Sequence, residues 1–358
     1  MSRPAFPYDA AGPEHLWASA FPADAVVDPQ GPVKFRLTKA SRIASCGSCF
    51  AERIAVALQR YGMSYLVREP GPRGITRELA ARYGYAPYSA RYGNVYSSLQ
   101  LSQLFERALG TFVPQELPWR DGAGGYRDPF RPRIQPDGFE NAAQLEAERD
   151  AHLAAVRSLL EDVDVLIVTL GLVDVWCSRA DGAAFPRCPG AGIGEFDDRK
   201  YEHRRLSVDD NVAELERAIA LLRRVNPSAR VLLSVSPVHL AATIGEPHIG
   251  RASTYAKAVL RVAVETVVRR HEHVDYVASY ELATLPQPGE GAYAPDRRHV
   301  TDRTAERVVR SFFQNFFGFD ADELAAGECE NALATTRECD EDELLRLFAG
   351  NAVISPPG

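Results

Sequence analysis

Three runs that are apolar almost throughout constrain the fold of this chain more than any other feature. They lie at residues 163–168, 231–233 and 274–277. A strand with one face in water alternates apolar and polar residues, whereas a strand buried on both faces reads as a nearly continuous apolar run. The three runs therefore predict central strands of a parallel sheet that is covered by helices on both sides.

Helical patterns alternate with these runs along the chain. Strands are expected at residues 41–45, 64–67, 163–170, 230–236 and 274–279. Helices are expected at residues 52–61, 97–109, 142–160, 208–225, 252–270 and 302–316. This alternation predicts an α/β fold, a three-layer α/β/α sandwich with a parallel sheet, in which ligand sites gather at the carboxyl ends of the strands.

Four segments lie outside this alternation. Residues 1–40 are rich in proline and read as an irregular arm packed on an α/β domain that we expect to span residues 41–318. Within that domain, residues 110–138 and 176–201 are long loop insertions that could wall a pocket. Residues 319–358 form an acidic tail with a short amphipathic stretch, which is a candidate for docking or homo-oligomerisation.

The charge balance argues against nucleic acid as a partner. The formal net charge is -7, whereas nucleic-acid-binding domains carry basic patches. We expect most of the scattered arginine pairs, among them Arg297 and Arg298, to lie on the solvated surface. No apolar run approaches the ~18 residues of a membrane span, and residues 1–20 lack the apolar core of a signal peptide. We therefore expect a cytoplasmic protein without a membrane span.

The chain has six cysteines, of which Cys46 and Cys49 form the one short C-x-x-C pair. A zinc site needs a second pair of ligands, and the other cysteines are spaced too irregularly to supply it. A lone C-x-x-C is also a weak sign of redox chemistry. His271 and His273 follow a predicted helix, where a solvated turn is the more common setting. We therefore expect no metal site and no cofactor.

Ser48 and Cys49 follow Gly47 at the turn between the first predicted strand and the first predicted helix. Glycine permits a sharp turn there. The N–H groups and the dipole at a helix N-terminus lower the pKa of a thiol from its usual ~8.5 and can receive a developing oxyanion. Cys49 is the better nucleophile at neutral pH, and Ser48 is the alternative. Taken alone, a small buried cysteine is the simpler interpretation.

Asp296 and His299 favour the interpretation of Cys49 as a nucleophile over that of a buried structural cysteine. Residues three apart in a helical turn share a face, so the carboxylate could fix the tautomer of the imidazole. The other ring nitrogen would then face the nucleophile as a general base. A local surface pair is the alternative interpretation. His239, which follows the predicted strand 230–236, is a second candidate that could contact a substrate.

The five residues from Gly47 to Ala51 spell GSCFA, and the chain resembles the family named after that motif. The resemblance spans roughly residues 40–315 and includes Trp176, the Asp296–His299 pair and residues 92–96, 128–132, 169–172 and 234–238. The family looks like a distant relative of the SGNH (GDSL-like) hydrolases, which are flavodoxin-like α/β/α esterases, lipases and acyltransferases. The resemblance therefore implies a flavodoxin-like sheet and acyl-transfer chemistry.

In the Gly-Asp-Ser register of those relatives, Cys49 stands in place of the nucleophilic serine and Ser48 in place of the aspartate. Their Gly-x-Asn-Asp block falls on Gly171 to Asp174, where Val173 replaces the asparagine that donates to the oxyanion. A valine side chain cannot donate. Asn94, with the backbone N–H of Gly93, could supply the missing donor.

We therefore expect an acyl-transfer enzyme of the SGNH-like type. It would hydrolyse an ester or thioester of a small-molecule or carbohydrate substrate through Cys49 or Ser48, with the Asp296–His299 pair as base. An O-acyltransferase acting on a sugar or another hydroxyl acceptor is the first alternative. The Val173 departure favours the second alternative, a non-catalytic carbohydrate-binding or scaffold protein on a decayed hydrolase fold.

Overall fold

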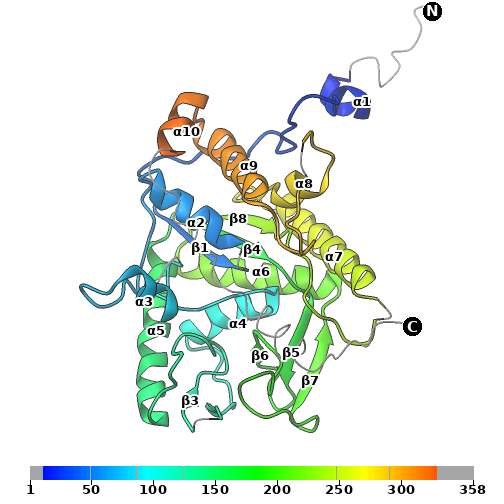
Figure 1. The fold of residues 1–358 in the computed structure, drawn as a ribbon. Coiled ribbons are helices and arrows are strands. Elements are labelled where there is room, and N and C mark those ends of the chain that lie inside the picture. The colour runs from blue at the N-terminus through cyan, green and yellow to red at the C-terminus, as the bar shows by residue number, and fades with distance from the viewer. Residues whose placement is uncertain are drawn as a thin grey trace, which may run out of the picture.

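A central parallel sheet flanked by helices organises the molecule (Figure 1). The structure, a computed structural model, describes residues 11–48, 50–85, 88–122, 124–246, 248–289 and 291–328. The sheet has the order β1-β4-β8-β9, with strands Ile43–Gly47, Val165–Leu170, Arg230–Val235 and Val274–Val277. All three neighbouring pairs are parallel. The prediction of an α/β fold with a parallel sheet is confirmed.

The predicted strand at residues 64–67 joins the sheet more weakly than expected. It pairs with β1 through a single parallel bridge between Ile43 and Tyr65. Ile43 donates its N–H to Ser64 O (2.9 Å) and accepts from the N–H of Leu66 (2.7 Å). With this segment placed outside β1, the five pieces follow the flavodoxin-like order 2-1-3-4-5.

Helices cover both faces of the sheet, which explains why its strands are apolar on both sides. Successive residues of β4 alternate between two apolar clusters, with Leu166 and Val168 in one and Val165 and Ile167 in the other. The first face is covered by α4 (Ser98–Ala108), α5 (Ala142–Asp162), α6 (Val208–Val225) and α7 (Ile249–Arg270). The second face is covered by α2 (Ala51–Arg60), α9 (Asp302–Phe312) and α10 (Ala321–Glu328).

Polar caps define where several of these helices begin. Side chains of Ser97, Asn141, Ser207 and Thr301 accept backbone N–H groups in the first turns of α4, α5, α6 and α9. Helix α2 differs, because its N-cap residue, Phe50, provides no such bond. The predicted helix at residues 302–316 divides into α9 and the π-helical turn η2 (Phe313–Phe317). Shorter helical segments are η1 (Pro13–His15), α1 (Trp17–Ala20), α3 (Arg77–Arg82) and α8 (Ser279–Thr284).

The two long insertions contain short strands that the sequence did not indicate. The first holds the hairpin of β2 (Trp119–Arg120) and β3 (Tyr126–Arg127). The second belongs to a small antiparallel sheet with the order β6-β5-β7, formed by Ala184–Phe185, Asp174–Ser178 and Tyr201–Arg205. The insertions pack on each other through an apolar cluster that includes Trp119, Phe130 and Phe185. The two-residue strands β2, β3 and β6 carry no readable periodicity, and the five residues of β7 are mostly polar, so the sequence indicated only loops.

The later part of the N-terminal arm and helix α10 both pack on the α9 side of the sheet. Phe35 and Leu37 from the N-terminal arm belong to that cluster, and Leu37 donates its N–H to Phe316 O (2.8 Å). Leu324 of α10 is fully buried there, and its carbonyl accepts from Tyr61 Oη (2.9 Å). Residues 329–358 of the acidic tail lie outside the described residues. The described helices include no candidate for a membrane span.

Candidate active site

The turn that follows β1 depends on a glycine. Gly47 has φ 141, and a Cβ added to it would lie 2.4 Å from Thr169 O of β4. Ser48 donates its N–H to the same Thr169 O (2.9 Å), and Gly47 O accepts from the N–H of Val95 (2.9 Å). Strand β4 and the loop around Val95 therefore hold this turn between them, and no other residue fits at position 47 without displacing backbone.

Ser48 is buried in this turn. It is 3% exposed, and its hydroxyl has no hydrogen-bond partner among the residues described. Gly171 packs against it, since a Cβ on Gly171 would lie 3.2 Å from Ser48 Cβ. Gly171 N–H already donates to Tyr96 O (2.8 Å), so it is engaged away from an oxyanion. Cys49, the predicted nucleophile, lies outside the described residues.

Cys46 does not behave as a reactive thiol. It is 1% exposed in the core formed with α4 to α7, and burial raises its pKa to about 12. A thiolate at this position would lack both solvent and a cation. This setting argues against a redox pair with Cys49. Within the described ranges, no group of three or more His, Cys, Asp or Glu side chains is placed to hold a metal ion.

Asp296 and His299 do meet, but through a tight turn instead of the helical turn that the spacing suggested. Asp296 Oδ1 accepts the backbone N–H groups of Arg298 (3.0 Å) and His299 (3.1 Å), and Oδ2 lies 2.6 Å from His299 Nδ1. Arg297 between them has φ 56, a left-handed conformation that is uncommon for a residue with a side chain. An aspartate that accepts N–H groups two and three residues ahead stabilises such a turn.

These bonds determine the protonation of the pair. Partial burial opposes ionisation of Asp296, but the hydrogen bonds from the His299 ring and from the two backbone N–H groups lower its pKa to about 2. Asp296 is therefore a carboxylate at neutral pH. Because a carboxylate can only accept, the imidazole proton lies on Nδ1 and the lone pair lies on Nε2.

Arg298 contacts that lone pair. Its Nη1 lies 2.8 Å from His299 Nε2, and a guanidinium can only donate. Arg297 is exposed as expected, but the surface prediction was wrong for Arg298, which is 7% exposed. The sequence signal that could have found this residue is its position inside the Asp-x-x-His motif. The atom that a general base would use is thus occupied by an arginine.

The two halves of the predicted site meet at one edge of the sheet. Phe50, the first residue of the described chain after Cys49, shares an apolar cluster with Val238 and Val300. Arg53 of α2 pairs with Asp302 of α9 at 2.9 Å. The turn after β1, the segment after β8 and the turn that carries His299 therefore lie together at the carboxyl ends of the strands, where ligands bind in this fold class.

His239 lies beside the turn that carries His299. Its backbone N–H donates to Arg298 O (3.3 Å), and its Nδ1 lies 3.0 Å from Ser253 Oγ. Its ring stacks on that of Tyr293, with the ring centres 4.8 Å apart. Burial first, and then the charges of Lys257 and Arg298, lower the pKa of His239. Its position next to the predicted base is compatible with the substrate contact that we expected.

Lys257 is a site residue that the sequence did not reveal. It is 1% exposed, and its Nζ donates to Gly171 O at 2.9 Å. A single lysine in an amphipathic helix is normally read as a surface residue, and no pattern around it indicates otherwise. Its ammonium fixes the loop that follows β4.

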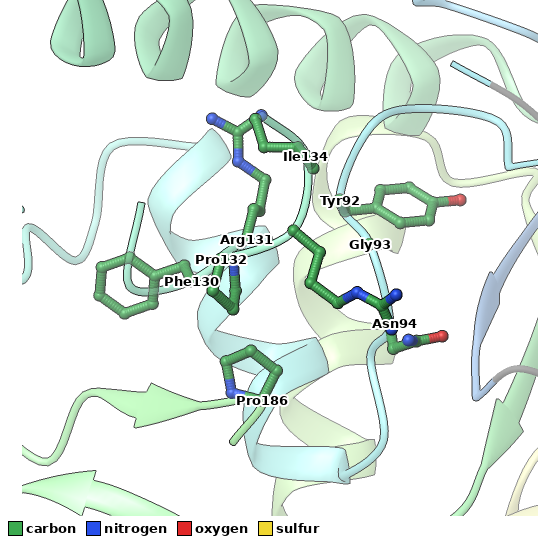
Figure 2. A pocket seen from close by; sticks show the side chains of 9 residues that line it. Tyr92, Gly93, Asn94, Phe130, Arg131, Pro132, Ile134 and Pro186 are labelled. Atoms are coloured by element: carbon green, nitrogen blue, oxygen red, sulfur yellow. The ribbon is translucent and has the colours of Figure 1, made fainter. Parts of the chain in front are cut away.

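Gly93 and Asn94, the expected oxyanion donors, lie in the loop that holds Gly47. Gly93 has φ 67, a conformation that glycine adopts readily. Tyr88 Oη donates to Asn94 Oδ1 (2.9 Å), which orients the side-chain nitrogen of Asn94 as its donor end. Figure 2 shows this loop opposite residues 130–134 and Pro186, around a cavity of about 10 Å³. Both long insertions therefore contribute to the wall of a cavity.

Asp174 is held away from the turn after β1 by partners of its own. Its Oδ1 accepts from Arg205 Nε at 2.8 Å and lies 3.2 Å from His203 Nε2. Burial opposes ionisation, but the hydrogen bonds from His203 and Arg205 lower the pKa of Asp174. The carboxylate thus joins β5 to β7. Val173 beside it is fully buried, and its side chain offers no donor.

The parallel sheet, its flanking helices and the carboxylate–imidazole pair at its carboxyl edge define an α/β protein of the flavodoxin-like kind. The model of the GSCFA family matches residues 42–312, which is more than half of the chain. The chain belongs to the GSCFA family.

Likenesses to solved structures are distant. A protein solved as a candidate platelet activating factor from Streptococcus pneumonia is 14% identical with a TM-score of 0.27, over 49% of this chain and 67% of that chain. A mutant of Axe2, an acetyl-xylooligosaccharide esterase from Geobacillus Stearmophilus, is 15% identical with a TM-score of 0.26, over 50% of this chain and 68% of that chain. No curated protein matches the chain. Such scores transfer no activity, so the chemistry rests on the geometry.

Proposed function

We propose that this protein is an acyl-transfer enzyme of the SGNH-like type that hydrolyses an ester or thioester, with Cys49 as nucleophile and the Asp296–His299 pair as base. The observation that carries the proposal is the 2.6 Å contact between Asp296 Oδ2 and His299 Nδ1. It lies in a turn whose Val300 packs with Phe50, the residue after Cys49. A base that is held in one tautomer beside a helix start is the arrangement that activates a nucleophile.

The surroundings of Ser48 support Cys49 as the nucleophile. Ser48 is 3% exposed, and its buried hydroxyl has no hydrogen-bond partner among the residues described. A serine nucleophile needs a base within hydrogen-bond reach. Helix α2 begins directly after Cys49 and Phe50 without a side-chain cap, and the positive end of its dipole would stabilise negative charge on the Cys49 sulfur.

The reaction would proceed in two halves. His299 Nε2 takes the Cys49 proton, the thiolate attacks the acyl carbon, and the carbonyl electron pair moves to its oxygen. The bond to the leaving alcohol or thiol then breaks, and the proton on Nε2 passes to the leaving group. In the second half, water gives a proton to Nε2 and attacks the thioester. The acid departs, and the proton returns to the sulfur. Arg298 must move off Nε2 before either half, because that nitrogen has one lone pair.

The oxyanion would be stabilised by Asn94 and by the backbone near it. Val173 offers no side-chain donor, and the N–H of Gly171 is engaged with Tyr96 O. Asn94 presents its amide nitrogen because Tyr88 occupies its oxygen. Loss of one such donor lowers the rate by about 10²–10³ in comparable enzymes, so Asn94→Ala tests this assignment.

Hydrolysis of p-nitrophenyl acetate tests the proposal. Cys49→Ala and His299→Ala are expected to lower kcat/KM at least about 10³-fold, whereas Arg157→Ala, at an exposed ion pair on α5, is the matched control. Activity that survives Cys49→Ala but not Ser48→Ala would reverse the assignment of the nucleophile. Activity that survives every one of these changes would remove the proposal.

The non-catalytic alternative rests on Val173 and on the arginine that occupies His299 Nε2. Labelling of Cys49 by iodoacetamide separates the two interpretations. If Cys49 is labelled at neutral pH and His299→Ala abolishes the labelling, the thiol is activated by His299. If labelling is slow and His299→Ala leaves its rate unchanged, the result supports a non-catalytic scaffold. Adding a sugar acceptor and measuring a transferred acyl group distinguishes an acyltransferase from a hydrolase.

A further inference from the structure

A second cavity adjoins the loop that carries Asn94. It has a volume of about 30 Å³, and its lining includes Asn94, Val95, Arg107, Phe130 and His152. A water molecule needs about 10–15 Å³ of such space, so this volume holds roughly two ligand atoms of water size, and a larger ligand would extend into the open side of the cavity. Because Val95 N–H donates to Gly47 O, the cavity lies one loop away from the end of β1.

Arg107 brings an unmatched cation to this cavity. The residue is 8% exposed, and its Nε and Nη2 have no hydrogen-bond partner in the part of the chain that the structure describes. The guanidinium lies 3.9 Å from the centre of the Phe130 ring, which attracts the charge but accepts no N–H bond. Burial is the main cause that lowers the pKa of Arg107, to about 9. A buried charge of this kind is stabilised strongly by a counter-ion with acceptor atoms.

The carboxylates near Arg107 are committed to other arginines. Asp128 bonds Arg131 (2.8 Å) and Arg149 (3.0 Å). Glu148 bonds Arg131 (2.5 Å) and Arg91 (2.7 Å). Positive charge therefore exceeds negative charge around Arg107, and the residues that the structure describes supply no acceptor for its Nε and Nη2.

His152 brings an unmatched acceptor to the same cavity. It is fully buried, and its Nδ1 lies 2.7 Å from Glu69 Oε2. Burial and the charge of Arg131 lower the pKa of His152 to about 4, so the ring is neutral and the proton on Nδ1 faces the carboxylate. Its Nε2 is then a lone-pair acceptor, and it has no partner among the described residues.

We propose that this cavity binds a small carboxylate that carries a hydroxyl group, with the carboxylate oxygens accepting from Arg107 and the hydroxyl donating to His152 Nε2. A planar carboxylate matches the fork of a guanidinium and supplies the missing negative charge. A neutral hydroxyl or a water would satisfy His152 but would leave the charge of Arg107 uncompensated. The binding site stands independently of the proposed acyl-transfer activity.

Thermal unfolding in sodium glycolate tests the site, because glycolate is the smallest anion with both groups. At equal ionic strength, replacing chloride by glycolate is expected to raise the Tm of the wild type by about 2–4 °C at saturation. Glycolamide, which keeps the hydroxyl and lacks the charge, is expected to raise it by less than about a quarter of that. Arg107→Met is expected to abolish the glycolate shift, and Arg157→Met, at an exposed pair on α5, is expected to keep it.

Each protein is compared with itself in chloride, so a change in the basal stability of Arg107→Met does not affect the result. Should Arg107→Met fail to fold, Arg107→Lys keeps the charge without the planar fork and is expected to lower the glycolate shift at least twofold. An equal shift in Arg107→Met and in the wild type overturns the proposal. Equal shifts with glycolamide and glycolate overturn it as well.

Discussion

Two histidines of this molecule lie beside arginines, and their surroundings differ. At the base edge, which consists of Asp296, Arg298 and His299, both ring nitrogens of His299 have partners. The Arg107 cluster consists of Arg107, Asp128, Arg131, Glu148 and His152. In it, Nε and Nη2 of Arg107 and Nε2 of His152 have no hydrogen-bond partner in the described chain. Hydrogen bonds on both ring nitrogens fix the orientation of a histidine. Buried polar groups without partners destabilise the folded state, and a ligand that supplies those partners gains binding free energy. We therefore propose a catalytic role for the first region and ligand binding for the second.

The largest expected effect is the loss of activity when the base edge is disrupted. Asp296→Asn retains the shape of the side chain but removes the carboxylate that holds the proton on His299 Nδ1. We expect kcat/KM for p-nitrophenyl acetate to fall about 10³–10⁴-fold, with an unchanged circular dichroism spectrum because Asp296 is half exposed. A loss smaller than about tenfold would mean that the pair is a surface feature without a catalytic role.

The free energies of unfolding of Arg131→Met and Arg107→Met test whether Arg107 lacks the ion pairs that Arg131 has. Arg131 is 3% exposed and bonds both Asp128 and Glu148, so Arg131→Met leaves two carboxylates with fewer partners. We expect it to lower the free energy of unfolding in urea by about 3–5 kcal/mol, and Arg107→Met to change it by less than about 1 kcal/mol. Equal losses would show that Arg107 is as strongly paired as Arg131, and the basis for an anion site would disappear.

His152 also predicts how the stability of the fold responds to acid. The folded-state pKa of His152 is about 4, below its ordinary value of 6.5. As the pH falls from 6.5 to 4, the unfolded chain binds a proton that the folded chain does not. Stability is therefore complete above about pH 6.5 and falls by about 3 kcal/mol by pH 4. His152→Gln is expected to remove that part of the slope in urea unfolding. A slope that persists in this variant would place the acid sensitivity elsewhere.

The sequence predicted the parts of this fold that follow from periodicity. The apolar run at residues 163–170 became β4, and the amphipathic pattern at residues 208–225 became α6 with the same bounds. Both predictions are confirmed because the pattern of burial is local. A strand buried on both faces has a continuous apolar run, and a helix buried on one face has apolar residues at helical spacing. The spacing of Asp296 and His299 predicted their contact, although the tight turn that creates it depends on the left-handed Arg297.

The rest depends on contacts between distant segments. Arg298 and Lys257 read as surface residues, and their burial follows from the packing of α7 and of the turn after Tyr293. The Arg107 cluster joins α4, the first insertion and α5, and no local pattern brings those three together. Whether Cys49 meets His299 stays a prediction, because Cys49 lies outside the described residues.

The smallest expected effect is on the labelling rate of Cys49, and it concerns Arg298, which occupies the Nε2 atom that a general base would use. Arg298→Met removes the donor from His299 Nε2 and leaves Asp296 on the opposite nitrogen. A hydrogen bond to a charged donor contributes about 1.5–3 kcal/mol. Its loss makes the lone pair available to the Cys49 proton, so we expect the iodoacetamide labelling rate of Cys49 at neutral pH to rise about tenfold.

Arg297→Met, at the exposed neighbour, is the matched control and is expected to leave the labelling rate unchanged. A fall in the rate for Arg298→Met would give Arg298 the opposite role. The guanidinium would then stabilise the thiolate directly, as a neighbouring cation does, and His299 would hold Arg298 in place. That outcome would make the base edge resemble the Arg107 cluster in one respect, because an arginine would be the group that meets the negative charge.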